Sequence, residues 1–442
     1  CKNNKNEKKI IPTTADSSAC KVVHLDWTRN AVMYEVNVRQ YTQEGTFKAF
    51  EKELPRLKKL GVDILWFMPI HPISEKNRKG TLGSYYAVKD YLAVNPEFGT
   101  IEDFKEVVNN AHKQGMKVII DWVPNHTGRD NAWIKQHPDW YVYEKSGEIV
   151  APHDWVDVAK LNYKNKEMRT AMIDAMKFWI KECDIDGFRC DVAGDVPVDF
   201  WVRARKELDA VKPIFFLAEA FEPELVKEAF DMVYGWDFHH VMNEIATGDK
   251  GAADVSEWLT TERELYCEDA YIMQFITNHD ENSWNGTEFE RMKEGVNAFA
   301  VLTYTLPGMP LIYTGQEVGM KKRFEFFEKD PIESWEANEY TSFYTKLNQL
   351  KHEHPALAAG LLGGKVNRIE TTEDENIFAF TRKVGKDEVV TIINLSKNPM
   401  KFDMTNNLPT GKFKEYFSGG DIDFSQTRSF DLKPWEYLVY VR

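Results

Sequence analysis

Strand-like and helix-like segments alternate along this 442-residue chain from about residue 32 to residue 314. Amphipathic stretches at helical spacing separate many of the apolar runs, and one of them extends from Thr100, a typical cap, to Gly115. Repeated strand–helix units build parallel sheets, and eight such units suit a closed barrel better than an open sheet. The pattern therefore predicts an α/β fold, a (β/α)8 TIM barrel, with strands near 32–38, 62–68, 117–120, 185–191, 214–219, 232–234, 271–277 and 310–313.

Two segments depart from this alternation. Residues 127–166 form a short insertion after the third strand that is rich in aromatic residues and has no clear helix, and such insertions lie at the catalytic face of a barrel. After residue 356 the helices cease, and alternating segments separated by Gly, Asn and Asp predict an antiparallel β domain. The predicted domains are a flexible N-terminal tether (1–25), the barrel (26–126 and 167–355), the inserted domain (127–166) and a C-terminal β-sandwich (356–442).

Composition excludes several classes of protein. A hydrophobic content of 43% with 29% charged residues is typical of a globular protein with a large core. The net charge of −14 disfavours a nucleic-acid partner, because phosphates attract basic surfaces. No run approaches the roughly 18 apolar residues of a membrane helix. The aromatic content of 13% fits either a large core or flat platforms for sugar rings.

The five cysteines show no C-x-x-C pair and no convincing disulfide pattern. Cys1 is followed by a polar stretch, rich in Lys, Asn, Ser and Thr, that extends to about Lys21. This start resembles the mature N-terminus of a bacterial lipoprotein, whose first cysteine carries lipid, and a cloning or numbering boundary is the alternative. The lipoprotein interpretation predicts attachment through Cys1 to a membrane, in the periplasm or at the cell surface.

Three acidic residues each follow a predicted strand: Asp191, Glu219 and Asp280. A carboxylate at the end of an apolar run is costly to bury, so it is either solvated or kept for chemistry. In a (β/α)8 barrel the ends of the strands converge on one face. We therefore expect the three carboxyl groups to share one site.

The surroundings of two of these acids predict different protonation states. Arg189 and Asp191 point the same way because side chains alternate along a strand, so Arg189 is expected to keep Asp191 ionised, as a nucleophile requires. The apolar residues before Glu219 are expected to raise its pKa and keep a proton available. Two such carboxyl groups, with Asp280 for electrostatic support, are what cleavage of a glycosidic bond requires.

Six segments carry a specific resemblance. They are Asp121-Trp122-Val123-Pro124-Asn125-His126, Gly187-Phe188-Arg189-Cys190-Asp191, the region of Glu219, residues 275–280, residues 85–91 and residues 308–317. In this order they resemble the four motifs, the second-strand loop and the eighth strand of the α-amylase family, glycoside hydrolase family 13. The resemblance extends over about residues 26–442.

The resemblance implies a retaining hydrolase that cleaves α-1,4 bonds of starch or maltooligosaccharides through a covalent glycosyl-enzyme. Asp191 would be the nucleophile, Glu219 the acid and base, and Asp280 the stabiliser of the transition state. Substrate binding is expected to involve Arg189, His126, His279, Tyr86 and Asp121. The aromatic loop residues Trp140, Trp236 and Trp284 are expected either to stack on glucose rings or to pack loops against the barrel.

Departures from the family pattern affect what is expected of calcium binding and of glucan binding. Gly194 and Asp195 stand where many members have Lys or Ala followed by His, a residue that contacts glucan and helps to form a calcium site. Asn125 resembles a calcium ligand but fits a turn at a strand end equally well. No cofactor is expected for the chemistry itself. Alternatives are a transglycosylase or trehalose-forming isomerase acting through the same intermediate and, more remotely, a non-catalytic glucan-binding protein.

Overall fold

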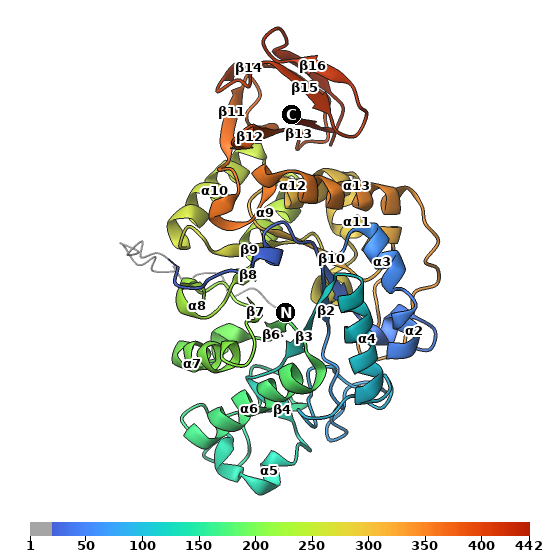
Figure 1. Cartoon of the computed structure of the whole chain (residues 1–442), viewed down its shortest axis with the longest axis vertical. Coiled ribbons are helices and arrows are strands. Elements are labelled where there is room, and N and C mark those ends of the chain that lie inside the picture. The colour runs from blue at the N-terminus through green and yellow to red at the C-terminus, as the bar shows by residue number, and fades with distance from the viewer. Residues whose placement is uncertain (1–19) are drawn as a thin grey trace.

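The structure is a computed structural model that describes residues 20–442 (Figure 1). Cys1 and most of the predicted tether lie outside the described residues. The described end of the tether, residues 20–25, is packed against the barrel: the Lys21 N–H donates to the Lys227 carbonyl at 2.7 Å, and His24 Nδ1 lies 2.9 Å from Asp231 Oδ1. Among residues 20–442, no helix has the length and apolar character needed to cross a bilayer.

Eight parallel strands close into a barrel in the order β1-β10-β9-β8-β7-β6-β3-β2. Each predicted strand coincides with one of them, so the (β/α)8 prediction is confirmed. The strands are β1 (Met33–Val36), β2 (Ile64–Phe67), β3 (Lys117–Trp122), β6 (Gly187–Cys190), β7 (Phe215–Ala218), β8 (Met232–Tyr234), β9 (Tyr271–Gln274) and β10 (Met309–Tyr313).

Helices surround this barrel and pack their apolar faces against it. Helix α4 begins where the sequence predicts, because Thr100 and Asp103 exchange capping hydrogen bonds. The helices are α1 (Val38–Tyr41), α2 (Phe47–Glu51), α3 (Leu54–Leu60), α4 (Ile101–Lys113), α6 (Lys166–Cys183), α7 (Val198–Asp209), α8 (Pro223–Glu228), α9 (Trp236–Thr247), α10 (Ala252–Leu265), α11 (Glu288–Met292), α12 (Val296–Thr305) and α13 (Glu339–Glu353).

Alternation along the strands decides which side chains enter the barrel. In β7, Phe215 and Leu217 belong to the apolar cluster inside the barrel, whereas Phe216 packs outward against the helices. Glu219 lies two residues beyond Leu217 and so continues the inward-facing row above an apolar floor. The same alternation in β6 aims Arg189 and Asp191 inward. The strands thus deliver charged groups to one end of the barrel.

The insertion leaves the barrel at the same end. It contains a two-stranded antiparallel sheet of β4 (His126–Gly128) and β5 (Val158–Lys160) together with a short helix, α5 (Trp133–Gln136). In Figure 1 this small unit lies at the opposite end of the molecule from the C-terminal domain.

The C-terminal antiparallel β domain is confirmed, but its strands form one sheet and not the two sheets of a sandwich. The order is β16-β15-β18-β13-β12-β11-β14-β17, and the register of β11 against β14 shifts between Glu370 and Thr371. Such irregularities bend a sheet. The strands are β11 (Asn367–Thr371), β12 (Ile377–Val384), β13 (Asp387–Asn394), β14 (Met400–Asn406), β15 (Lys412–Glu415), β16 (Asp421–Asp423), β17 (Ser429–Leu432) and β18 (Tyr437–Val441).

A disulfide joins Cys20 to Cys267, a bond that the sequence analysis did not predict. The two residues are 247 positions apart, and no spacing pattern in the sequence marks them as partners. The fold brings them together, because His24 stacks on Tyr271 at 4.0 Å between ring centroids and holds the N-terminal segment beside the start of β9.

Replacing Cys20 with serine is expected to lower the free energy of unfolding by about 2–5 kcal/mol, because the cross-link restricts the unfolded chain. Thermal melting under oxidising conditions measures the loss. Cys267→Ser and the double variant should show the same loss as Cys20→Ser, since each removes the same bond. Additive losses, or no loss, would show that the bond does not stabilise the fold.

Candidate active site

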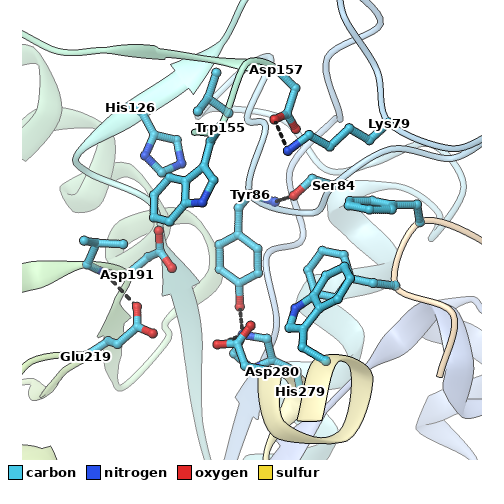
Figure 2. A pocket seen from close by; sticks show the side chains of 15 residues that line it. Lys79, Ser84, Tyr86, His126, Trp155, Asp157, Asp191, Glu219, His279 and Asp280 are labelled. Carbon is cyan, nitrogen blue, oxygen red and sulfur yellow. Dashed lines mark hydrogen bonds and ion pairs between the residues drawn. The ribbon is translucent and has the colours of Figure 1, made fainter. Parts of the chain in front are cut away.

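The three strand-end acids line a single cavity of about 350 Å³ at the insertion end of the barrel. Figure 2 shows Asp191, Glu219 and Asp280 around this cavity, with Tyr86 between them. His126, His279 and Trp284 line the same cavity. Residues far apart in the sequence therefore meet in a space of the size used for small ligands.

Arg189 lies on the barrel side of the cavity and forms ion pairs with three acidic residues. Its side chain is fully buried, and its Nη1 lies 2.9 Å from Asp121 Oδ1 and 3.0 Å from Asp191 Oδ1. Its Nη2 lies 3.0 Å from Glu219 Oε2, and its Nε donates to the Tyr234 hydroxyl at 3.1 Å. One guanidinium thus faces three carboxylates, which makes it the main counter-charge of the site.

Asp121 lies on the floor beneath Tyr86. Its Oδ2 accepts a hydrogen bond from the Tyr86 hydroxyl at 3.2 Å and another from Trp66 Nε1 at 3.2 Å. The carboxylate is fully buried, and burial raises the pKa of Asp121 to about 6 although Arg189 and His279 act to lower it. Asp121 therefore fixes Tyr86 and Arg189 from beneath the cavity.

Glu35 on β1 is a buried partner of His279 that the sequence analysis missed. His279 Nδ1 lies 2.5 Å from Glu35 Oε1, and its Nε2 lies 2.8 Å from the Tyr86 hydroxyl and 3.3 Å from Asp280 Oδ2. Burial acts to lower the pKa of His279, but Asp280 and Glu35 outweigh it and raise the pKa to about 9. The imidazole is therefore a cation at neutral pH.

This raised pKa predicts a pH-dependent contribution to stability. The contribution is complete below pH about 6.5, the usual value for a histidine in an unfolded chain, and is lost as the pH rises through about 9. The melting temperature of wild type should therefore exceed that of His279→Gln by more at pH 7 than at pH 10. His240→Gln, at an exposed position of α9, serves as the control. A difference that stays constant from pH 7 to pH 10 would contradict the assignment.

The proton distribution between Asp191 and Glu219 differs from the prediction. Burial raises the pKa of Asp191 well above its usual range, and the Glu219 carboxylate adds to the rise. Burial acts in the same direction on Glu219, but Arg189 and the Val192 N–H, which donates at 2.8 Å, hold the pKa of Glu219 below its usual value. Two predictions are therefore wrong for this geometry. Arg189 does not keep the pKa of Asp191 low, because burial outweighs it, and Glu219 does not have the raised pKa, because Arg189 and the Val192 N–H stabilise its charge.

The charge on Glu219 raises the pKa of Asp191, so the titrations of the two carboxyl groups are linked. A nucleophilic role for Asp191 would require that the proton lie on Glu219. His126, the other predicted histidine, behaves differently: burial lowers its pKa to about 3, so it is neutral at the cavity wall.

The three predicted tryptophans have different positions. Trp284 lines the cavity and is 53% exposed, which leaves its ring free to meet a sugar. Trp140 is buried and stacks on His137 at 3.9 Å between ring centroids, and it does not line the cavity. Trp236 packs against Tyr234 and Phe275 at 5.4 and 5.0 Å and is also absent from the cavity lining. For Trp140 and Trp236, the alternative of loop packing is what the structure shows.

Residues that were not predicted also line the cavity, among them Lys79, Trp155, Asp157, Phe326 and Phe327. They lie on the loop after β2, in the insertion and on the segment between β10 and α13. Asp157 forms an ion pair with Lys79 at 2.9 Å. The high aromatic content of the insertion is the one sequence signal that indicated these lining residues.

The described surroundings of Asn125 contain no cluster of carboxylates of the kind that calcium commonly uses. Calcium takes six to eight oxygen ligands and commonly several carboxylates, and within residues 20–442 no group of three or more His, Cys, Asp or Glu side chains is placed to hold a metal. The Asn125 carbonyl accepts from the Leu161 N–H at 3.0 Å, and its Nδ2 lies 3.5 Å from His126 Nδ1. These contacts favour the turn interpretation, and calcium binding stays a prediction.

Comparisons with known proteins agree with this geometry. The sequence profile described as alpha amylase, catalytic domain, matches residues 12–157 and 136–394. The chain is 27% identical over 402 residues to alpha-amylase MalA of Haloarcula japonica, a match that covers 87% of this chain and 58% of that protein.

Two solved structures are similar over nearly the whole chain. One is the maltogenic alpha-amylase AmyB of Thermotoga neapolitana, with a TM-score of 0.85 and 29% identity, covering 93% of this chain and 98% of that one. The other is an alpha-amylase from Lactobacillus plantarum, with a TM-score of 0.84 and 30% identity, covering 94% and 99%. The protein therefore belongs to the α-amylase family and is a glycoside hydrolase-type enzyme.

Proposed function

We propose that the enzyme is a retaining α-glucan hydrolase that cleaves α-1,4-glucosidic bonds of starch or maltooligosaccharides. The observation that carries the proposal is the convergence of Asp191, Glu219 and Asp280 on one cavity, with Arg189 beneath two of them. The names of the relatives, which include alpha-amylases and neopullulanase 2 of Thermoactinomyces vulgaris, support an α-glucan as the substrate class.

In the first step, Asp191 attacks the anomeric carbon while Glu219 donates its proton to the leaving oxygen. The bond between that carbon and that oxygen breaks, and a covalent glycosyl-enzyme forms. Asp280 and the carboxylate of Asp191 stabilise the positive charge that develops on the sugar. His279 and Tyr86, joined at 2.8 Å, would hold the hydroxyl groups and the ring of the same glucose unit.

In the second step, Glu219 removes a proton from water and the hydroxide displaces Asp191 from the anomeric carbon. Two inversions at this carbon give net retention of configuration. A sugar hydroxyl in place of the water would give transglycosylation, so hydrolysis and transfer differ only in what reaches the intermediate.

Product analysis from maltoheptaose over time tests the proposal. We expect shorter maltooligosaccharides with the α configuration at the newly formed reducing end. Accumulation of longer oligomers or of trehalose would contradict plain hydrolysis. No cleavage of any α-1,4-glucan would contradict the substrate class.

We also propose a location outside the cytoplasm, in the periplasm or at the cell surface. The Cys20–Cys267 disulfide supports it, because disulfides form and persist in oxidising compartments. Lipid attachment to Cys1 stays a prediction. Fractionation of the producing cells and the mass of the N-terminal peptide test location and lipid separately.

A further inference from the structure

Three segments meet along one side of the cavity. They are residues 77–83 of the loop between β2 and α4, residues 155–157 of the insertion, and residues 326–328 between β10 and α13. Together we call them the rim. Each contributes side chains to the cavity lining, with Lys79, Asp157 and Phe327 as examples.

The loop after β2 is bound to the insertion by the Lys79–Asp157 ion pair and a hydrogen bond from Asn77, which together we call the clasp. Lys79 Nζ lies 2.9 Å from Asp157 Oδ1, and the Asp157 side chain is 5% exposed, so the ion pair is shielded on the carboxylate side. Next to it, Asn77 Nδ2 donates to the Val156 carbonyl at 3.2 Å. Arg129 Nε donates to the same carbonyl at 2.7 Å and so holds this part of the insertion in place.

The other end of the loop is bound to the segment after β10. The Leu82 N–H donates to the Phe327 carbonyl at 3.0 Å, and the Thr81 N–H donates to Glu328 Oε1 at 2.8 Å. Buried Arg39 donates from Nη1 to the Gly83 carbonyl at 3.1 Å and to the Phe326 carbonyl at 3.3 Å. Arg39 thereby ties both segments to the barrel.

Gly80 allows the close approach of these two segments. Its φ is +61°, and a Cβ atom at this position would lie 2.5 Å from the Phe327 Cβ. A side chain would therefore both strain the backbone and push the segments apart. The rim is thus a continuous structure from the insertion to the segment after β10.

The proposed roles of the cavity residues indicate on which side of the scissile bond the rim lies. Glu219 protonates the leaving oxygen, so it marks the side of the leaving chain. Tyr86, His279 and Asp280 surround the sugar whose anomeric carbon reacts. In Figure 2, Tyr86 lies between Glu219 on one side and the Lys79–Asp157 pair on the other. The Lys79–Asp157 end of the rim therefore stands beyond the reacting sugar, on the glycone side.

We infer that the rim closes the glycone side of the cavity, so that an α-glucan enters with its non-reducing end first and short products are released from that end. Lys79 and Asp157 form the polar end of this wall and face the hydroxyl groups of the terminal glucose unit. The inference rests on the proposed α-glucan hydrolysis and adds its direction and its dependence on a free chain end.

The test compares two substrates, p-nitrophenyl α-maltoheptaoside and the same compound with a 4,6-O-benzylidene group on its non-reducing glucose. Products are separated by chromatography. We expect kcat/KM for the free substrate to exceed that for the blocked one by about 100-fold, since a closed wall excludes the added group. Equal rates would overturn the inference and leave the proposed hydrolysis intact. Absence of cleavage of both substrates would overturn the proposed function itself.

A double variant of the clasp, compared with a control variant, tests whether the clasp closes the glycone side of the cavity. Opening the clasp with Lys79→Ala and Asp157→Ala together is expected to raise the relative rate on the blocked substrate by about tenfold. Lys76→Ala, at an exposed position just before the rim and outside the cavity lining, should leave the ratio unchanged. A double variant that melts like wild type yet keeps the original ratio would overturn the role of the clasp.

Discussion

Asp191→Asn is expected to lower the turnover of maltoheptaose by about 10⁴-fold or more, because an amide cannot form the covalent intermediate and the groups of one mechanism act as a unit. Initial rates of reducing-end release measure this loss. The fold should survive, since Asn keeps the shape of the side chain and removes a carboxylate that lies among others.

The matched control is Asp154→Asn, which changes an exposed acid of the insertion that is absent from the cavity lining. It should retain turnover close to that of wild type. Unchanged turnover in a well-folded Asp191→Asn protein would exclude Asp191 as the nucleophile. An equal loss in both variants would show that the effect is not specific to the site.

Arg189→Leu is expected to destabilise the protein by about 3–5 kcal/mol, the usual cost of removing one partner from a buried charge cluster. It leaves the carboxylates of Asp121, Asp191 and Glu219 without their shared counter-charge. Because the stranded carboxylates prefer to be protonated, the loss should be larger at pH 8 than at pH 5.

Chemical denaturation at the two pH values measures both effects. Arg203→Leu is the control, because the Arg203 side chain is 40% exposed and its pair with Glu207 on α7 is a surface pair, worth about 0–1 kcal/mol. A loss for Arg189→Leu no greater than that for Arg203→Leu, or one independent of pH, would contradict the role of Arg189 as the central counter-charge.

The barrel and the convergence of the three acids on one cavity could be predicted from sequence for the same reason. Apolar runs with turn residues mark buried strands, and an acid that ends such a run must lie at the barrel mouth. Asp191 and Glu219 illustrate this, since each continues an inward-facing row. Glu35 was not predicted as a site residue, because a single acid within an apolar run gives no indication of its partner. That partner is His279, 244 residues away.

Features that depend on contacts between distant segments could not be predicted. Cys20 and Cys267 pair only because the N-terminal segment packs beside β9, and the Lys79–Asp157 pair needs both the insertion and the loop after β2 in place. The protonation of Glu219 was misjudged for a similar reason. Its apolar neighbours in sequence are visible, but the Val192 N–H that stabilises its charge comes from another strand end.

Trapping of the glycosyl-enzyme tests the central claim most directly. With α-maltotriosyl fluoride as donor, the reactive fluoride can leave without acid assistance, and Glu219→Gln should slow the attack of water so that the intermediate accumulates. Peptide mapping by mass spectrometry should then place the maltotriosyl group on the peptide that contains Asp191, attached at that residue. A glycosyl group on any other residue, or turnover of the fluoride by wild type with inverted configuration, would contradict the account.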